Sequence, residues 1–568
     1  MMKKSTLLLV ALYSVYAFAQ TSVGALPTVG AVAVNYPVDP VKRSASVEVL
    51  RGPYLQSGTP TSVVVKWRTD IATESVVNYG TSLNALSMTA SNTALTTEHE
   101  VLISGLTPDT KYYFNIGNQA EVLSESDAGE MYVITAPLAG TRQFVRAWIL
   151  GDAGTANNNQ RNVRDAYYNY VANVPSNTGK TDMMLFLGDN AYGSGTDEEY
   201  QRALFDIYDV MLKKSVAWSC LGNHDGKSAD SKTQSGPYYD IFTFPTAAQA
   251  GGTASGTEAY YSFDYANIHF IILDSHHTGR EVGGAMYNWT LADIQNTKQD
   301  WIVTLFHHPV YTKGSHDSDT EGRLIEMREN FMPMMEENGV DLILNGHSHS
   351  YERSYFLNGH YGFANTFNAE EISKGGHTVG TTGNGDGRED GDGAYQKDRK
   401  DTEGAVYITT GSAGQKSGGD LNHQAMSVSL NQLGSCVMEV EDDGQGGQNL
   451  TVKFLRENDE IEDYFTINKT AIDLKAGGTE QAPKSGMLSY DSDKGVVDLK
   501  VDEDEQLIKV KFYNNLGQLV KESKKRSIKT GKLSKGLYVI EIITDKKTYS
   551  ESVTLEKYEK DTNKPITR

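Results

Sequence analysis

The chain has almost no cysteine, no surplus of basic residues and no long hydrophobic run. Cys220 and Cys436 are the only cysteines among 568 residues, and both lie in apolar, strand-like segments. A disulfide framework is thereby excluded. The two thiols are predicted to be buried and free, with a single disulfide as the alternative. The formal net charge of −21 argues against a general binder of nucleic acid or anionic membranes, because such partners need basic surface.

The longest apolar run near the N-terminus starts at Leu7 and falls short of the ~20 residues that a transmembrane helix needs. Lys3 and Lys4 precede it, and the small residues Ala17 and Ala19 close it. This pattern predicts a signal peptide over residues 1–19, with cleavage before Gln20. We expect an exported protein without a transmembrane span. A membrane anchor is the alternative reading.

A chain of this length predicts roughly three or four domains. Residues 47–137 show short alternating strands separated by turn residues, which is the pattern of a β-sandwich. Within this segment, GLTPDTKYYFNI places Leu106, Pro108 and Tyr112 as in the tyrosine corner of fibronectin type III modules, which it resembles. We expect this domain to be structural or to form an interface.

From residue 143 to 470 apolar strands alternate with helical segments, which predicts an α/β domain with strands buried on both faces. A Gly- and Asp-rich insertion occupies residues 375–403. Asp386, Asp390 and Asp392 alternate in it, but no complete calcium-loop pattern is met, so a flexible insertion is favoured over a calcium site. Gly, Pro and Ser then predict a linker over residues 471–490.

Residues 491–558 return to alternating strands and turns, and they are rich in lysine. The segments NNLGQLV and LSKGLYVIEI resemble the C-terminal sorting domain of type IX secretion. The resemblance implies that the type IX secretion machinery is a partner and that the protein is secreted or held at the cell surface. A small β-sandwich with no sorting role is the alternative.

Residues competent to bind metals recur at the ends of apolar runs in the α/β domain. Side chains at the carboxyl ends of strands converge in such folds, so residues far apart in sequence can meet in one pocket. Each of these residues alone is more typical of a turn, a helix cap or a packed imidazole. His308, beside His307, is interpreted in that way. The candidate ligands are Asp152, Asp189, Tyr192, Asn223, His307, His347 and His349.

Carboxylate, phenolate, amide and imidazole donors favour hard or borderline cations over a thiolate zinc site. If Asp189 bridges two ions, each ion has four protein ligands and open positions for water. Such a two-metal centre, with ions roughly 3.5–4 Å apart, stabilises both the attacking and the leaving oxygen of a displacement.

The ordered motifs GDAG, GDNAY, GNHD, the His307 segment and GHSH resemble those of the purple acid phosphatases, within the calcineurin-like metallophosphoesterases. The resemblance implies a metallophosphoesterase sandwich of αββα layers. It also implies that Fe(III) binds to Asp152, Tyr192 and His349. A divalent metal, Zn, Fe or Mn, would then bind to Asn223, His307 and His347, with Asp189 as the bridge. Gly154 stands where many metallophosphoesterases carry a histidine ligand, and Tyr192 is interpreted as its replacement.

The same resemblance implies catalytic roles for His224 and His316, which would bind phosphate oxygens or protonate the leaving group. A solvated surface histidine is the alternative for His316. Asp317 stands where plant members carry a second histidine, and its charge is expected to repel an anionic substrate. Asp225 stands where many members have glutamate.

The sequence therefore predicts an exported binuclear acid phosphatase that hydrolyses phosphate monoesters by metal-hydroxide attack. A phosphodiesterase or nucleotide hydrolase on the same centre is one alternative. A surface adhesion protein with a relic catalytic domain is another.

Overall fold

The computed structural model describes residues 46–555, except for gaps at 126–128, 176–178, 368–385, 398–403, 443–446 and 470–487 and short gaps beyond residue 487. The predicted signal peptide, 1–19, and most of the predicted linker, 471–490, lie outside the described residues. Within the described ranges, no helix combines the length and the apolar character that crossing a membrane requires.

The first domain is made of strands alone. Its strands are β1 (Val49–Gln56), β2 (Ser62–Gly80), β3 (Met88–Ser104), β4 (Lys111–Gly117), β5 (Val122–Ser124) and β6 (Tyr132–Ile134). The long strand β2 pairs with β1 through its first half and with β4 through its second, while β3 runs beside both halves. Tyr112 is buried, and its hydroxyl accepts a hydrogen bond from the Thr107 N–H at 3.1 Å, as expected for the predicted corner.

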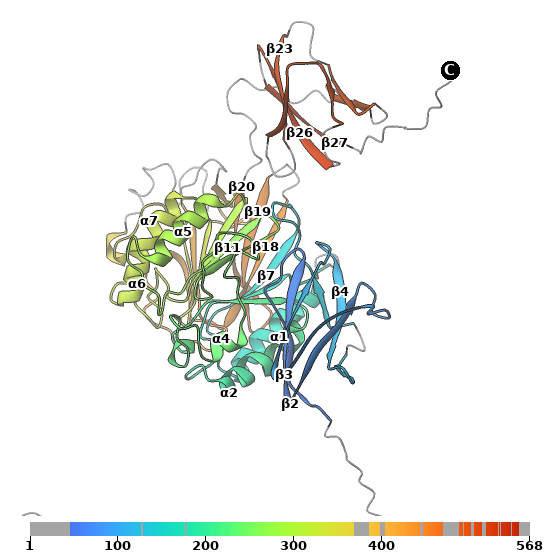
Figure 1. The fold of residues 1–568 in the computed structure, drawn as a ribbon. Helices are drawn as coiled ribbons and strands as arrows, with labels where there is room; N and C mark the ends of the chain where they lie inside the picture. The colour runs from blue at the N-terminus through green and yellow to red at the C-terminus, as the bar shows by residue number, and fades with distance from the viewer. Residues whose placement is uncertain are drawn as a thin grey trace, which may run out of the picture. The chain divides into compact units, whose positions relative to one another are not determined.

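Two seven-stranded mixed sheets form the centre of the next domain (Figure 1). In spatial order, the strands of one sheet are β10 (Tyr261–Tyr265), β11 (Ile268–Ile272), β12 (Trp301–Leu305), β13 (Leu342–Asn345), β16 (Val406–Thr410), β14 (Tyr351–Ser354) and β17 (Met426–Leu430). Those of the other sheet are β15 (Tyr395–Lys397), β20 (Ile461–Lys469), β19 (Gln448–Arg456), β18 (Gly434–Asp442), β7 (Val145–Leu150), β8 (Met183–Phe186) and β9 (Val216–Ser219).

The helical segments connect the strands. They are α1 (Asn158–Asn173), α2 (Asp197–Tyr200), η1 (Gln201–Phe205), α3 (Asp206–Leu212), η2 (Asp225–Lys227), α4 (Pro237–Ile241), α5 (Ala285–Asn296), α6 (Gly322–Glu326), η3 (Met327–Phe331), α7 (Met332–Glu337) and η4 (Ala364–Thr366). Helix α1 begins at a cap in which the Asn157 side chain accepts a hydrogen bond from the Gln160 N–H.

The layers follow from the burial of the strands on both faces. One apolar core contains residues from both sheets, such as Val145 and Leu342. A second core contains Ile343 of β13 together with Met286 of α5 and Met335 of α7. Helix α1 contacts β18 and β19 of the other sheet. The order is therefore helix, sheet, sheet, helix. Cys220 and Cys436 are buried in this domain as free thiols, in agreement with the sequence.

A third group of strands follows the gap at 470–487. They are β21 (Leu488–Asp491), β22 (Val496–Leu499), β23 (Leu507–Tyr513), β24 (Leu519–Ser523), β25 (Ser527–Lys529), β26 (Gly536–Thr544) and β27 (Thr548–Leu555). They form a three-stranded and a four-stranded sheet around an apolar core of their own, which includes Val510, Phe512 and Ile540.

A buried histidine ties helix α5 to the edge of the first α/β sheet. The His269 ring lies between Asp264, at 2.7 Å from Nδ1, and Asp293 of α5, at 3.0 Å from Nε2. Burial alone would lower its pKa, but the two carboxylates raise the pKa of His269 to about 9. The protonated ring is therefore a structural cation in the folded protein.

We expect His269→Gln to change how stability depends on pH. The pKa of His269 is raised in the folded state, so its contribution is fully present below pH 6.5 and is lost as pH rises through about 9. That loss can reach about 3 kcal/mol. Urea unfolding at pH 6 to 9.5 should show a steeper decline for the wild type than for the variant. The same slope in both would contradict the assignment, and His277→Gln, at an exposed position, is the control.

Candidate metal centre

The candidate ligands follow the carboxyl ends of five parallel strands. Strands β7, β8 and β9 are parallel neighbours in one sheet, and β12 and β13 are parallel neighbours in the other. Because the two sheets pack face to face, these strand ends open into one region. The ligands follow in the same order: Asp152 after β7, Asp189 and Tyr192 after β8, Asn223 after β9, His307 after β12, and His347 and His349 after β13.

Three of these side chains form a tight group. The Tyr192 hydroxyl donates a hydrogen bond to Asp152 Oδ1 at 3.0 Å and lies 3.2 Å from His349 Nε2. His349 Nε2 is 3.5 Å from Asp152 Oδ1. Donors about 2.1 Å from a shared octahedral ion stand about 3 Å apart, so the three atoms have the spacing of ligands to one cation.

A second group forms around Asp189. His307 Nε2 lies 2.9 Å from Asn223 Oδ1 and 3.5 Å from Asp189 Oδ1. The other ring nitrogen, Nδ1, is 2.8 Å from the Leu187 carbonyl oxygen. A proton on Nδ1 satisfies that carbonyl and leaves Nε2 as the nitrogen available to a metal.

His347 links the two groups. Its backbone N–H donates to Asp152 Oδ2 at 2.6 Å, and its ring lies 4.9 Å from that of His307. Asp152, Asp189 and His307 each offer a ligand atom within 4.8 Å of the others. The structure thus brings all seven candidate ligands together.

His308 also approaches this region. A ring nitrogen of His308 lies within 4.8 Å of nitrogens of His307 and His347, and its Nδ1 is 2.9 Å from the Ser275 hydroxyl. Its ring is buried and packed between other imidazoles, which agrees with the interpretation as a packed histidine.

Three candidate ligands have a left-handed backbone. The φ angles of Asp152, Asp189 and His347 are 56°, 53° and 66°. Such conformations cost non-glycine residues of order 1 kcal/mol each and persist at functional sites where surrounding contacts enforce them. Here the turn directly after the strand places the residue within the group of candidate ligands.

The contact between the first two loops explains the position of Tyr192. The N–H of Tyr192 donates to the Gly154 carbonyl, and the N–H of Gly154 donates to the Asp189 carbonyl. A Cβ atom on Gly154 would come within 2.4 Å of the backbone at residues 190–191. A side-chain ligand at position 154 therefore does not fit, whereas the phenol from the second loop reaches the same region.

The electrostatics of the group suit a cation. Asp152 and Asp189 are almost fully buried, and among the described residues neither pairs with a lysine or an arginine. Burial and these two carboxylates raise the pKa of Tyr192 well above its ordinary value. Buried carboxylates are stable only when they are paired or coordinate metals, so the donor set fits the hard or borderline cations predicted from sequence.

Both predicted catalytic histidines border the group. His224 Nδ1 is 2.7 Å from the Gly193 carbonyl oxygen, and His224 Nε2 is 4.0 Å from Asp189 Oδ2. The ring of His316 stacks on the ring of His347 at 3.6 Å. His316 and His224 are each partly exposed, at 31% and 28% of their side chains, which leaves both accessible to a substrate.

Glu321 was not identified from sequence, although it orients two histidines. Its carboxylate is 2.9 Å from His316 Nδ1 and 3.6 Å from His347 Nε2. Burial would raise its pKa, but hydrogen bonds from His347 and from the Asp317 N–H, with His316 nearby, lower the pKa of Glu321 to about 2. The carboxylate therefore stays charged in acidic solution. Its spacing from the motifs follows no repeat that could have revealed it.

The expectation that Asp317 repels an anionic substrate stays a prediction, and a neighbouring lysine bears on its strength. Lys313 Nζ lies 2.5 Å from Asp317 Oδ1 and 2.9 Å from Asp319 Oδ2. This ammonium group offsets much of the local negative charge, which the sequence could not show because the pairing depends on the turn between the two residues.

Asp225 is a further residue whose role the sequence left open. It is fully buried and accepts hydrogen bonds from the N–H of Gly222, from the N–H and side chain of Asn190, and from the Tyr200 hydroxyl. Burial and then the charge of Asp189 raise the pKa of Asp225 to about 6. Asp225 thus holds together the loops that carry Asp189 and Asn223.

In the described part of the Gly- and Asp-rich insertion, residues 386–397, Asp386 and Asp390 bind to groups of the same segment. Asp386 Oδ1 accepts from the N–H groups of Arg388 and Asp392, and Asp390 pairs with the Arg388 side chain. Within that described stretch, Asp386, Asp390 and Asp392 do not form a cluster with metal-binding spacing. The rest of 375–403 lies outside the described residues.

Three family models match successive parts of the chain. Residues 51–129 match the purple acid phosphatase N-terminal domain, residues 145–351 match the calcineurin-like phosphoesterases, and residues 493–556 match the secretion system C-terminal sorting domain. All seven candidate ligands lie within the second range.

The curated relatives of the chain include several proteins named as purple acid phosphatases. Purple acid phosphatase 1 of Ipomoea batatas is 26% identical over 329 residues, which are 54% of this chain and 64% of that protein. The protein of Arabidopsis thaliana named probable inactive purple acid phosphatase 1 is 24% identical over 45% of this chain and 43% of that protein. The matches thus span less than two thirds of each relative. The solved structure of purple acid phosphatase PPD1 from Lupinus luteus has a TM-score of 0.52 and 16% identity, with 77% of each chain covered, which shows a shared fold.

The fold and the matched region define residues 145–351 as a calcineurin-like phosphoesterase domain. With its N-terminal match and its curated relatives, the chain is similar to the purple acid phosphatases.

We expect Asp225→Ala to weaken metal binding without removing a ligand. The loops carrying Asp189 and Asn223 would lose their shared acceptor, and such changes around metal ligands typically cost 10–100-fold in affinity. Competition with a chelator, followed by metal analysis, measures the change. Tyr200→Phe removes only one of the hydrogen bonds to Asp225 and should have a smaller effect. Unchanged metal affinity in a folded Asp225→Ala protein would contradict the role.

Proposed function

We propose that the chain is an exported binuclear metal-dependent acid phosphatase that hydrolyses phosphate monoesters. The supporting observation is the convergence of seven oxygen and nitrogen donors from five strand ends. Two of the seven are the buried carboxylates Asp152 and Asp189, which have no lysine or arginine partner in the described ranges. The calcineurin-like phosphoesterase match and the purple acid phosphatase homologues support the same reaction class.

In this proposal Asp152, Tyr192 and His349 would hold Fe(III), Asn223, His307 and His347 would hold a divalent ion, and Asp189 would be a ligand shared by both. The phenolate of Tyr192 is a hard, strong donor that favours Fe(III). Bound metals would supply Lewis acidity toward the phosphoryl oxygens and lower the pKa of coordinated water.

The histidines beside the ligands complete the proposal. Because Glu321 accepts from His316 Nδ1, the His316 Nε2 atom is left for a substrate oxygen. Likewise, the Gly193 carbonyl occupies His224 Nδ1 and leaves His224 Nε2. One of the two donates a proton to the leaving oxygen as the P–O bond breaks, and the other stabilises the charge on the phosphoryl group. The low pKa of Glu321 keeps the orientation of His316 in mildly acidic solution.

The proposed location is outside the cytoplasm. The sorting-domain match at residues 493–556 supports secretion or attachment to the cell surface by the type IX system. The predicted signal peptide over residues 1–19 would direct the first export step.

We expect Asp189→Ala to abolish both metal retention and hydrolysis. The substitution removes the proposed bridge and leaves each ion with fewer donors. Metal analysis of the purified protein and the rate of p-nitrophenyl phosphate hydrolysis at pH 5 are the measurements. Asp165→Ala, at an exposed position of α1, is the matched control. Full activity in Asp189→Ala would overturn the two-metal proposal, and a folded, metal-loaded wild type without activity would favour the relic alternative.

We expect Tyr192→Phe to remove the visible charge-transfer absorption of the iron-loaded protein. Among the proposed donors, the phenolate of Tyr192 is the one that would give this band with Fe(III), and phenylalanine keeps the ring without the oxygen. The visible spectrum and the iron content of wild type and variant provide the comparison. Tyr200→Phe should keep the colour, because Tyr200 bonds to Asp225 and not to a proposed ligand. A coloured Tyr192→Phe protein would show that Tyr192 does not bind the iron.

A further inference from the structure

His316 lies in a stretch of chain that no helix or strand holds in place. Residues 306–321, all of them described, connect β12 to α6 without regular secondary structure. The His316 ring nevertheless stacks on the ring of the candidate ligand His347 at 3.6 Å. Backbone pairing of a sheet or helix does not fix this connection, so side-chain contacts must set the position of the imidazole.

Lys313 closes this connection into a loop around His316. Its Nζ atom lies 2.5 Å from Asp317 Oδ1 and 2.9 Å from Asp319 Oδ2. Lys313 precedes His316 in the chain and the two aspartates follow it, so one ammonium group joins the segments on both sides of the imidazole. The N–H of Asp319 also donates to Asp317 Oδ1 at 2.8 Å, which holds the two aspartates together.

The backbone of Lys313 is fixed to other parts of the domain. Its N–H donates to Oε1 of the buried Glu352 of β14 at 3.2 Å. Its carbonyl oxygen accepts a hydrogen bond from the Leu421 N–H at 2.7 Å. The ammonium group therefore extends from a fixed point, and its two ion pairs transmit that position to Asp317 and Asp319.

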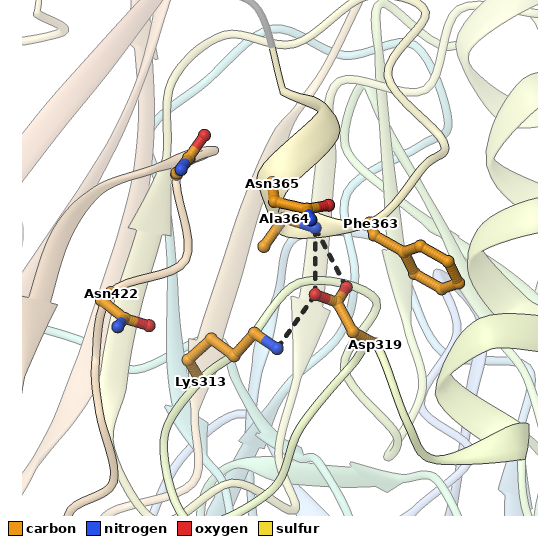
Figure 2. Close-up of a pocket in the computed structure, with 7 residues that line it drawn as sticks. Lys313, Asp319, Phe363, Ala364, Asn365 and Asn422 are labelled. Atoms are coloured by element: carbon orange, nitrogen blue, oxygen red, sulfur yellow. Dashed lines mark hydrogen bonds and ion pairs between the residues drawn. The ribbon is translucent and has the colours of Figure 1, made fainter.

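The end of the loop that carries Asp319 is fixed in the same way. Figure 2 shows the Asp319 carboxylate accepting from the Ala364 N–H as well as from Lys313. The buried guanidinium group of Arg328 donates to the Ser318 carbonyl at 2.6 Å. Both ends of the loop are thus held, and Lys313 joins them.

Glu321 connects the loop to the imidazole. The Asp317 N–H donates to Glu321 Oε1 at 3.0 Å, and the same oxygen is 2.9 Å from His316 Nδ1. A shift of Asp317 would therefore move the carboxylate that orients the His316 ring.

The charges explain why the ammonium group matters. Asp317, Asp319 and Glu321 lie within five residues, and Lys313 pairs with two of them. Without Lys313 these carboxylates would repel one another and the loop would open. Ion pairs that are partly exposed, as here, contribute little to folding stability. By contrast, a shift of about 1 Å in a group that acts on a substrate can cost about 100-fold in rate.

We propose that Lys313, through Asp317 and Asp319, positions the imidazole of His316 for its role in phosphate ester hydrolysis. The inference rests on the proposed phosphatase function and adds positioning residues to it. Lys313 acts through His316 and does not itself contact the reacting atoms.

The surroundings of Lys313 allow a matched pair of variants. Lys313 and Asp319 line a pocket of about 450 Å³, together with Phe363, Ala364 and Asn422 (Figure 2). The pocket leaves room for a larger cation, so Lys313→Arg can keep both ion pairs. Lys313→Met keeps the unbranched stem and removes the charge.

The first test measures kcat/KM for p-nitrophenyl phosphate at pH 5. Lys313→Met should decrease kcat/KM by roughly 10- to 100-fold, with metal content and Tm close to those of the wild type. Lys313→Arg should restore most of the loss. When added to His316→Ala, Lys313→Met should cause less than about a twofold further decrease, because the two residues act as one unit. Lys298→Met, at an exposed lysine between α5 and β12, is the control.

Three results would overturn the proposal. The first is an unchanged kcat/KM in Lys313→Met. The second is an equal decrease from Lys313→Met in the presence and in the absence of the His316 imidazole, which a merely structural role would give. The third is full activity in His316→Ala, because Lys313 would then have no imidazole to act through.

A second measurement requires no hydrolysis. Diethyl pyrocarbonate modifies accessible imidazoles, and peptide mass spectrometry gives the rate at His316 relative to His277, an exposed histidine of the same molecule. Loss of the ion pairs should free the His316 ring and raise this ratio several-fold in Lys313→Met but not in Lys313→Arg. If the wild type hydrolyses no phosphate ester, the proposed function fails, while this ratio still tests the positioning. An unchanged ratio in Lys313→Met would contradict the positioning by Lys313.

Discussion

The need to balance two buried carboxylates underlies the arrangement of the catalytic domain. Asp152 and Asp189 lie where water is nearly excluded, and their neighbours are a phenol, an amide and imidazoles. An isolated charge in such a place is very costly, so the region favours bound cations. The parallel strands, the glycine at position 154 and the loop clamped by Asp225 all serve to hold these groups close together.

Much of this arrangement could be predicted from sequence because it depends on local patterns. Apolar runs that end in Asp, Asn or His mark strands whose carboxyl ends meet, and the strands ending near Leu150, Phe186, Ser219, Leu305 and Asn345 are all present. The alternating strand pattern of the sequence before and after the α/β domain also predicted the two β domains that flank it. The type and order of the elements therefore follow from periodicity and turn residues.

Contacts between distant loops could not be predicted in the same way. Glu321 reaches His316 and His347 through a turn that no periodic pattern encodes, and the pairing of Lys313 with Asp317 partly offsets the charge of that acid. The pocket joins Phe363 to Asn422 across a wide sequence separation. Each of these depends on the path of an irregular loop, which is fixed by tertiary packing and hydrogen bonds rather than by residue preference.

The left-handed backbone at Asp152, Asp189 and His347 lowers the folding stability of the protein at the centre. Glycine adopts these conformations at almost no cost, so a chain released from its catalytic role would gain stability by exchanging any of the three. Folding and catalysis therefore oppose each other at these positions. Each acid or imidazole kept there represents stability given up for chemistry, and random drift would move such a chain toward a more stable, inert protein.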